Sequence, residues 1–263
     1  MTDKCMSERL ILVTNDDGIH APGLQALIHV AQTFGRVLVI APHEGQSGMS
    51  HAITVKYPIR IEKLSEEEKL TVYSCTGTPV DGVKLAINRL AGRPLTMVLS
   101  GINHGANSSS SIVYSGTMGA VLEGCINGIP SIGFSLLDFS KEADFSTAIL
   151  YAKHIVSRVL EEGLPSGTCL NVNIPRNNGE PIKGIKICRQ NKGLWREEFD
   201  RRIDPQNQEY YWLTGEFHNL EPEADDTDEW ALTHRYVSVV PVKIDLTDYQ
   251  FINRIKHWEN HTP

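Results

Sequence analysis

The chain has 263 residues, of which 41% are hydrophobic and 22% are charged, the balance of an ordinary globular protein. This length is enough for one large α/β domain or two small ones. The formal net charge is −7. Proteins that bind nucleic-acid polymers need a basic surface for the phosphate backbone, so the charge argues against a partner of that kind.

The sequence carries no recognisable targeting or membrane signal. The apolar segment at residues 9–14 is short and polar residues follow it at once, so it predicts a strand and not a signal peptide. No run approaches the roughly 20 apolar residues that a membrane helix needs. Five scattered cysteines, with no Cys-x-x-Cys pair, indicate neither a disulfide framework nor a zinc ribbon; they are Cys5, Cys75, Cys125, Cys169 and Cys188. We therefore expect a cytoplasmic protein that does not contact a membrane.

Strand and helix signals alternate through the first two-thirds of the chain. Apolar runs predict core strands at residues 10–13, 37–40, 97–99, 132–136 and 170–174. Helical spacing or an initial proline predicts helices at residues 22–31, 79–90, 116–127 and 144–162. Residues 53–61 and 70–75 have strand character and predict a hairpin. Such repeated β-α units predict a doubly wound, mainly parallel sheet, in which ligands bind at the carboxyl ends of the strands.

The character of the sequence changes after Pro175. The helical rhythm disappears, residues 221–229 form an acidic run, and three of the four tryptophans fall between residues 190 and 235. A last strand is predicted at residues 237–240. We expect a single domain over residues 1–263 in which residues 176–235 form an extended arm or hairpin region that packs on a partner subunit.

Three polar clusters each follow a predicted core strand, at residues 15–18, 43–50 and 100–105. Parallel strands would bring all three to the same edge of the sheet. Two adjacent carboxylates there disfavour each other's ionised form unless a cation offsets the charge. Mg²⁺ and Mn²⁺ prefer carboxylate, amide and hydroxyl oxygens. The clusters supply such a set in Asp16, Asp17, Ser47 and Asn103.

Each member of this set also has a simpler interpretation. Asp16 and Asp17 before Gly18 are typical of a turn with a helix cap, Ser47 of a turn hydroxyl, and Asn103 of an Asx turn. The convergence of three oxygen-rich loops on one edge favours a metal site over these separate explanations.

A second signal lies at the start of the helix predicted from residue 116. Backbone amides at a helix start, joined by the hydroxyls of Ser115 and Thr117, form an anion site around Gly116. The alternative is that Ser115 is merely a helix cap. Next to a bound cation, which can reverse the field of an acidic protein locally, this helix start predicts a phosphoryl-transfer site.

Other catalytic motifs are missing or incomplete. The sequence has no phosphate-binding P-loop motif and no Gly-x-Gly-x-x-Gly motif. Residues 45–48 approach a nucleophile elbow, but the second glycine comes one position early. Histidines near the proposed edge receive no catalytic role.

These motifs, in this order, resemble the SurE survival proteins, a family of 5′(3′)-nucleotidases that also trim short polyphosphate. The resemblance spans nearly the whole chain, and its motifs lie at residues 11–18, 41–48, 77–79, 100–103, 114–117, 170–175, 211–212, 226–228 and 236–239. Two stretches depart from the family's usual pattern. The loop at residues 43–45 is less basic than in many members, and residues 108–111 are a uniform serine run.

The resemblance implies a Rossmann-like core with a C-terminal β-rich extension, and one divalent ion, Mg²⁺ or Mn²⁺, on the four residues named above. It implies homodimers, or tetramers built by exchange of the C-terminal arm. The expected function is metal-dependent hydrolysis of nucleoside 5′- and 3′-monophosphates. Asn15 and the segment from Ser115 to Thr117 would bind the phosphate, and either a water molecule or one of Asp16 and Asp17 would attack phosphorus.

Three other functions are compatible with parts of the pattern. A non-catalytic nucleotide sensor could share the fold, but adjacent carboxylates favour turnover. A serine esterase could use Ser47 or Ser115, and its activity would survive removal of metal. The aromatic arm could belong to a protein whose chief role is interaction with a partner.

Overall fold

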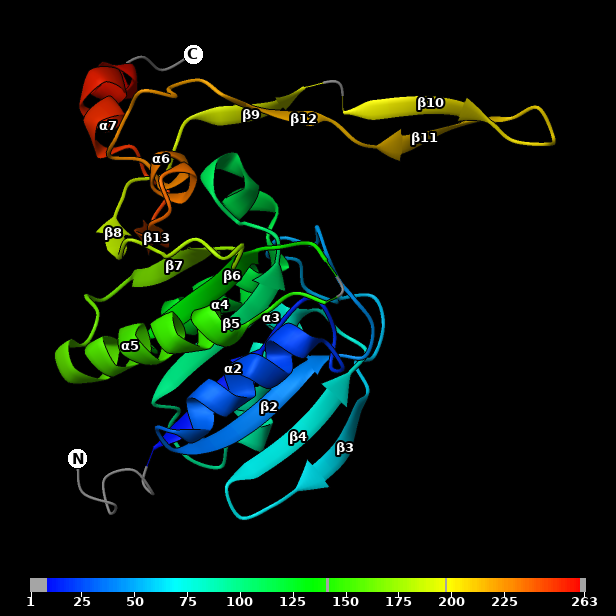
Figure 1. The fold of residues 1–263 in the computed structure, drawn as a ribbon, viewed down its shortest axis with the longest axis vertical. Helices are drawn as coiled ribbons and strands as arrows, with labels where there is room; N and C mark the ends of the chain where they lie inside the picture. Colours follow the sequence, from blue (N-terminus) through cyan, green and yellow to red (C-terminus); the bar gives the residue numbers. More distant parts are fainter. Residues whose placement is uncertain (1–8, 141, 197, 261–263) are drawn as a thin grey trace.

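The computed structural model describes residues 9–140, 142–196 and 198–260, so Cys5 lies outside the described residues. A nine-stranded sheet in the order β3-β4-β2-β1-β5-β6-β7-β13-β8 forms its centre (Figure 1). Its strands are β1 (Leu10–Thr14), β2 (Arg36–Pro42), β3 (Ile61–Glu66), β4 (Leu70–Cys75), β5 (Met97–His104), β6 (Ser131–Leu137), β7 (Thr168–Pro175), β8 (Ile185–Ile187) and β13 (Val237–Lys243).

The strands from β4 to β7 in this order all run parallel, while β3 and β13 are antiparallel to their neighbours β4 and β7. Helices cover both faces. They are α2 (Pro22–Gln32), α3 (Pro79–Leu85), α4 (Gly116–Ile126) and α5 (Ser146–Glu162). The alternation of apolar side chains along β1 divides the core, because Ile11 and Val13 pack with α2 and α5 while Leu12 packs with α3 and α4. The predicted doubly wound α/β fold is confirmed.

The predicted strand at residues 53–61 is wrong. The hairpin partner of β4 is β3, which begins only at Ile61. Pro58 has no backbone N–H to give to a sheet, and the backbone N–H of Thr54 donates to the carboxylate of Asp81 on α3. The segment before β3 is therefore a loop held against α3. The helix predicted to run to residue 90 is present, but its last turn is a π-helix, η1 (Ala86–Leu90).

Both edges of the central sheet are short or irregular. The strand β8 has three residues. At the opposite edge the pairing of β3 with β4 shifts register between Lys63 and Ser65, and Lys63 Nζ lies 2.7 Å from Glu66 Oε2.

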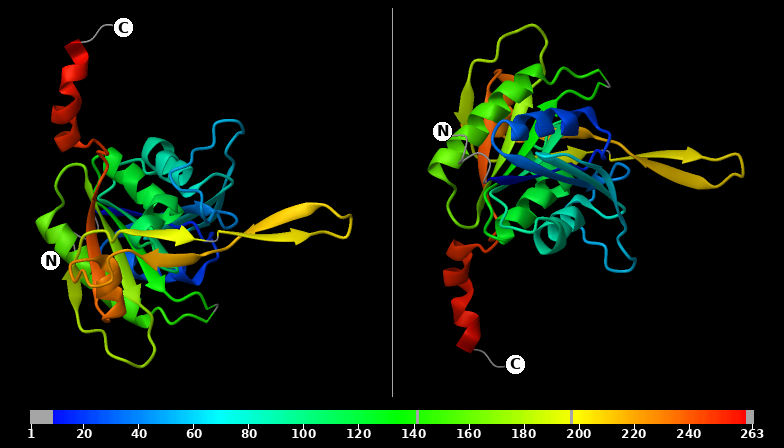
Figure 2. Two further views of the ribbon diagram at one scale, coloured as in Figure 1. Left: turned by 90° about the horizontal axis from the view of Figure 1, so that it is seen from above. Right: turned by 90° about the horizontal axis from the view of Figure 1, so that it is seen from below.

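Beyond β8 the chain leaves the sheet in an extended hairpin, as the two views of Figure 2 show. Two antiparallel pairs build it, β9 (Gly193–Arg196) with β12 (Glu216–Asn219) and β10 (Phe199–Ile203) with β11 (Glu209–Leu213). The chain then returns through α6 (Asp228–Thr233) to β13 and ends in α7 (Tyr249–Ile255) and η3 (Lys256–Asn260). The β-rich extension is as expected, but α6 and α7 are helices that the sequence pattern did not predict.

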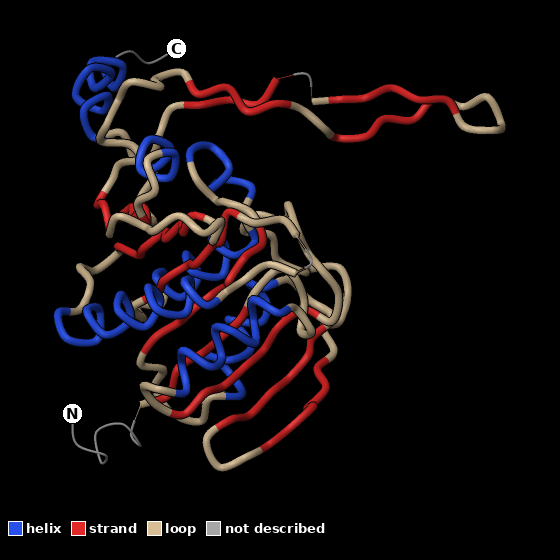
Figure 3. Tube along the Cα trace, viewed as in Figure 1, coloured by secondary structure: helices blue, strands red, loops and turns tan. Residues whose placement is uncertain are grey.

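Loops gather at one end of the sheet, on the right in Figure 3. Because the central strands are parallel, the segments after β1, β2 and β5 all emerge at their carboxyl ends. None of the described helices is long and apolar enough to cross a membrane.

Candidate active site

Asp16 lies directly after β1 and packs against the start of α4. It is 4% exposed, and its Oδ1 accepts a hydrogen bond of 2.5 Å from the Thr117 hydroxyl. A Cβ on Gly116 would lie 2.8 Å from the Cβ of Asp16, so only glycine allows this close approach. Burial raises the pKa of the Asp16 carboxyl to about 6, although the hydrogen bond from Thr117 acts in the opposite direction. The structure thus joins the predicted acidic cluster to the predicted anion site.

Asp17 turns toward the end of β5 instead. Its Oδ2 accepts a hydrogen bond of 3.2 Å from the backbone N–H of His104, and burial raises its pKa. Next to His104, the Asn103 Nδ2 donates to the carbonyl oxygens of His104 and Gly105 at 3.2 and 2.8 Å. This pairing leaves the Asn103 Oδ1 as the end of the amide that can face a cation.

Hydrogen bonds hold the loop after β2 in place on both sides of Ser47. Before it, the Gln46 N–H donates to the backbone oxygen of Asp16 at 2.7 Å. After it, the Ser50 N–H donates to the Tyr114 oxygen at 3.1 Å, and the Ser50 hydroxyl donates to the Val113 oxygen at 2.7 Å. Ser47 itself is exposed between these anchors. The loop after β2 therefore meets the loop after β1 through the backbone, and the Asp17 side chain joins the loop after β1 to the end of β5.

Ser115 caps α4, because its Oγ accepts a hydrogen bond of 3.0 Å from the Met118 N–H. The cap interpretation is therefore correct, but it does not exclude an anion site, since the hydroxyl still has a proton to donate. Asn15 is fully buried, and one of its amide hydrogens is used on the Gly18 oxygen at 3.0 Å.

Several buried polar atoms at these strand ends have no hydrogen-bond partner within the described part of the chain. They are Thr14 Oγ1, Asn15 Oδ1 and Ser100 Oγ. Thr14 and Ser100 are also register partners on β1 and β5. Unpaired buried polar groups are costly and mark positions where water or a ligand is expected.

The available donor set fits a hard cation. Within the described ranges, no group of three or more His, Cys, Asp and Glu side chains is arranged to hold a metal. Two carboxylates, together with an amide and a hydroxyl on the adjoining loops, suit Mg²⁺ or Mn²⁺, since these ions bind oxygen and Mg²⁺ usually keeps several waters.

A buried acid on α4 was missed by the sequence analysis. Glu123 is 4% exposed and accepts hydrogen bonds from Lys84 Nζ at 2.8 Å, His51 Nε2 at 3.2 Å and Asn127 Nδ2 at 2.9 Å. Burial opposes its ionisation, but these hydrogen bonds lower its pKa overall. Because His51 ends the Ser47 loop, Glu123 ties that loop to α4. The signal was present in the sequence, since Glu123 is the one charged residue of α4.

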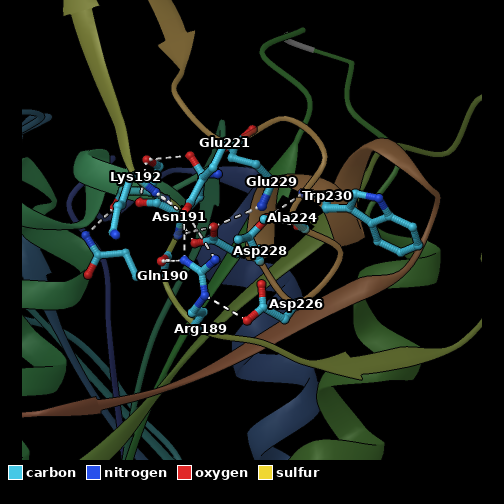
Figure 4. Close-up of polar contacts among 12 residues, drawn as sticks. Arg189, Gln190, Asn191, Lys192, Glu221, Ala224, Asp226, Asp228, Glu229 and Trp230 are labelled. Carbon is cyan, nitrogen blue, oxygen red and sulfur yellow. Dashed lines mark hydrogen bonds and ion pairs between the residues drawn. The ribbon is translucent and has the colours of Figure 1, made fainter.

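A second cluster that the sequence did not predict lies at the base of the arm, around Asp228 and Asn191 (Figure 4), and it contacts the segment before Ser115. The carboxylate of Asp228 accepts hydrogen bonds of 2.9 Å from the backbone N–H groups of Ser109, Asn191 and Glu229. Ser108 donates its hydroxyl to Glu229 Oε1 at 2.5 Å. Two residues of the serine run thus bind the arm base, and η2 (Ser109–Tyr114) leads from them to the start of α4.

Comparison with known proteins agrees with this geometry. The family model described as survival protein SurE matches residues 11–197. A protein named 5′-nucleotidase SurE from Flavobacterium psychrophilum is 52% identical over 97% of this chain and 99% of its own length. One of the same name from Phocaeicola vulgatus is 52% identical over 95% and 96%. The crystal structure of the SurE protein from Aquifex aeolicus matches with a TM-score of 0.82 and 39% identity, covering 95% of this chain and 99% of that one. The chain belongs to the SurE family.

Proposed function

We propose that this protein is a divalent-metal-dependent phosphomonoesterase that hydrolyses nucleoside 5′- and 3′-monophosphates to nucleoside and phosphate. The observation that carries the proposal is the contact between the Asp16 carboxylate and the first turn of α4. An anion could approach that helix start only if a cation offset the carboxylate. The family relatives that bear the name 5′-nucleotidase support the same reaction.

One Mg²⁺ or Mn²⁺ would be held by Asp16, Asp17, Ser47 and Asn103. When bound, such an ion neutralises developing charge on the phosphoryl group and lowers the pKa of a water molecule. Asp17 and Asn103 are positioned by the backbone at the end of β5, whereas Ser47 is positioned by the anchors of its loop.

The chain's own groups would bind and orient the phosphate. The backbone N–H of Gly116 and the remaining hydroxyl proton of Ser115 are donors at the start of α4, whereas the Thr117 N–H faces the Asp16 carboxylate and would reach the phosphate beside it. The second amide hydrogen of Asn15 is a further donor, since its first is used on Gly18. These donors would bear the negative charge that grows on the phosphoryl oxygens.

The nucleophile is either a water molecule or a carboxylate of Asp16 or Asp17. The hydrogen bonds to Thr117 and His104 hold each carboxylate at one oxygen, which favours fixed ligands over an attacking group. We therefore propose the water route. A phosphoaspartate trapped by rapid quench during turnover of AMP would refute it.

The reaction is tested by phosphate release from 5′-AMP, 5′-GMP and 3′-AMP with Mn²⁺ or Mg²⁺, each repeated with EDTA. We expect turnover that EDTA abolishes and that returned metal restores. Nucleotide binding without phosphate release would instead identify a sensor. Turnover that survives EDTA would identify an esterase that uses Ser47 or Ser115.

We further propose that the protein is a cytoplasmic homodimer or tetramer assembled through the arm. The strands β10 and β11 expose Phe199, Tyr211 and Trp212, which is unfavourable in a solitary hairpin. Replacement of residues 199–213 by a short glycine-serine linker should lower the mass measured by light scattering to that of a smaller assembly. An unchanged mass would reject the arm as the interface, and cell fractionation would test the location.

A further inference from the structure

An exposed aromatic side chain lies at the carboxyl ends of the parallel strands, where the proposed metal ligands also lie. Phe139 follows β6, and 83% of its surface is exposed. One side of its ring rests on Gly105, because a Cβ added to Gly105 would lie 2.2 Å from the Phe139 Cε1 and 2.5 Å from its Cζ. The ring can pack against Gly105 because glycine has no side chain, and most of the ring faces solvent.

Hydrogen bonds from backbone N–H groups hold both Gly105 and the turn that carries Phe139 in place. The Gly105 N–H donates to the Leu136 oxygen at 2.8 Å. The Asp138 N–H donates to the same oxygen at 2.7 Å, and the Ser140 N–H donates to Asp138 Oδ1 at 2.9 Å. Phe139 thus lies in a turn after β6 that these hydrogen bonds stabilise.

The same glycine also contacts the proposed metal site. Its carbonyl oxygen accepts the 2.8 Å hydrogen bond from Asn103 Nδ2. One residue, Gly105, therefore separates the exposed ring from a proposed metal ligand. If the phosphate of a nucleoside monophosphate were bound at the metal, its sugar and base would extend outward from the metal toward the loop that carries Phe139.

We propose that Phe139 is the stacking platform for the nucleobase of the substrate. The proposal rests on the nucleotidase function proposed above and adds how the base is held. An exposed phenyl ring offers a flat apolar face, and every nucleobase has a π-face that can stack on it. Stacking does not depend on the hydrogen-bonding pattern of the base, so this platform accepts all bases and favours purines, which have the larger face.

A purely structural role is a poor explanation of Phe139. A side chain that is 83% exposed buries little surface, so its truncation removes little of the stabilisation that comes from burial. Phe139→Ala should therefore melt close to the wild-type temperature. This expectation separates substrate binding from folding.

The test compares two phosphate monoesters that differ by the base. Phe139→Ala should lower kcat/KM for 5′-AMP by about tenfold to a hundredfold, chiefly through KM, while kcat/KM for ribose 5-phosphate stays within about twofold. Phe139→Leu should resemble Phe139→Ala because it lacks a flat face, and Phe139→Tyr and Phe139→Trp should restore AMP turnover. Leu150→Ala, which truncates an exposed apolar side chain on α5, is the matched control and should change neither substrate.

The outcomes distinguish this proposal from the proposed function. Equal losses for AMP and ribose 5-phosphate, or no loss for either, would overturn the stacking role. Failure of the wild-type protein to release phosphate from any nucleotide would overturn the nucleotidase function itself. Inhibition by adenosine gives an independent readout. Its inhibition constant should rise about tenfold or more in Phe139→Ala, and an unchanged constant would again reject the stacking role.

Discussion

Carboxylates are removed from solvent in two regions of the molecule, and the two regions differ in the hydrogen bonds that these carboxylates receive. At the base of the arm, Asp228 receives three backbone N–H donors, and its neighbours Asn191 and Ser109 are hydrogen-bonded to each other as well. At the end of β1, the Asp16 carboxylate accepts a hydrogen bond from the Thr117 hydroxyl and is also stabilised by the backbone N–H groups of Asp16 and Thr117, and the Asp17 carboxylate accepts from one backbone N–H. Burial raises the pKa of all three aspartates.

The difference lies in what remains unsatisfied around each acid. Three buried polar atoms that have no hydrogen-bond partner among the described residues lie beside Asp16 and Asp17: Thr14 Oγ1 and Asn15 Oδ1 come just before Asp16, and Ser100 Oγ is on the residue of β5 that pairs with Thr14. A carboxylate saturated by backbone donors stabilises a fold, whereas one that keeps open lone pairs beside other open oxygens is prepared for a ligand. Burial of an acid thus serves structure at one place and chemistry at the other.

The largest expected effect is the loss of turnover in Asp17→Asn. Metal-dependent phosphate release should fall by more than the roughly 10–100-fold that follows loss of a residue orienting a metal ligand. The metal-free variant should melt at or above the wild-type temperature, because a partly buried charge has been replaced by a neutral amide. Asp225→Asn, an exposed acid near the arm base, is the control. Full metal-dependent turnover in Asp17→Asn would refute the metal assignment.

The opposite result is expected at the arm base. Asp228→Ala leaves three backbone N–H groups without their acceptor, which should lower the free energy of unfolding by about 3 kcal/mol. Urea denaturation measures this change. A variant as stable as the wild type would show that water replaces the carboxylate without cost and would remove the contrast between the two regions.

Metal binding provides the next comparison. At a free Mn²⁺ concentration of about 100 times Kd, the free energy of unfolding of the wild type should rise by about 2.7 kcal/mol. The same addition should stabilise Asp228→Ala by a similar amount but leave Asp17→Asn nearly unchanged. Stabilisation of Asp17→Asn equal to that of the wild type would place the metal elsewhere in the molecule.

The smallest effect concerns Glu123 and pH. Its pKa is lowered in the folded protein by hydrogen bonds from Lys84, His51 and Asn127. A lowered pKa contributes stability that is present above the unfolded value of 4.5 and is lost as the pH falls through the folded value. Glu123→Gln should therefore flatten the acid side of the stability profile. Glu62→Gln, on the exposed strand β3, should leave the profile as it is, and identical profiles for both variants would reject this role.

The sheet could be predicted from sequence because its signals are local. Continuous apolar runs place β1, β2 and β5, and the parallel arrangement then brings Asp16, Asp17 and Asn103 to one edge. The hairpin was predicted too early, since residues 53–61 have strand propensity but contain Pro58, and the polar alternation that marks β3 follows it.

The supporting contacts could not be predicted in this way. Asp228 meets the Ser109 backbone across 119 residues of sequence, and Glu123 meets His51 across 72. No periodicity links such positions, and each acid alone resembles a solvated surface charge. Phe139 and Gly105 likewise come together only because β5 and β6 are neighbours in the sheet.

The edge strands of the central sheet bear on whether copies of this chain can add to one another. Open strand edges invite other chains to add to them. Here β8 is only three residues long, and β3 carries a register shift together with the Lys63–Glu66 ion pair. Both edge strands therefore resist the addition of another chain. A substitution that straightened β3 or removed its charges would allow correctly folded copies of the enzyme to aggregate through this edge.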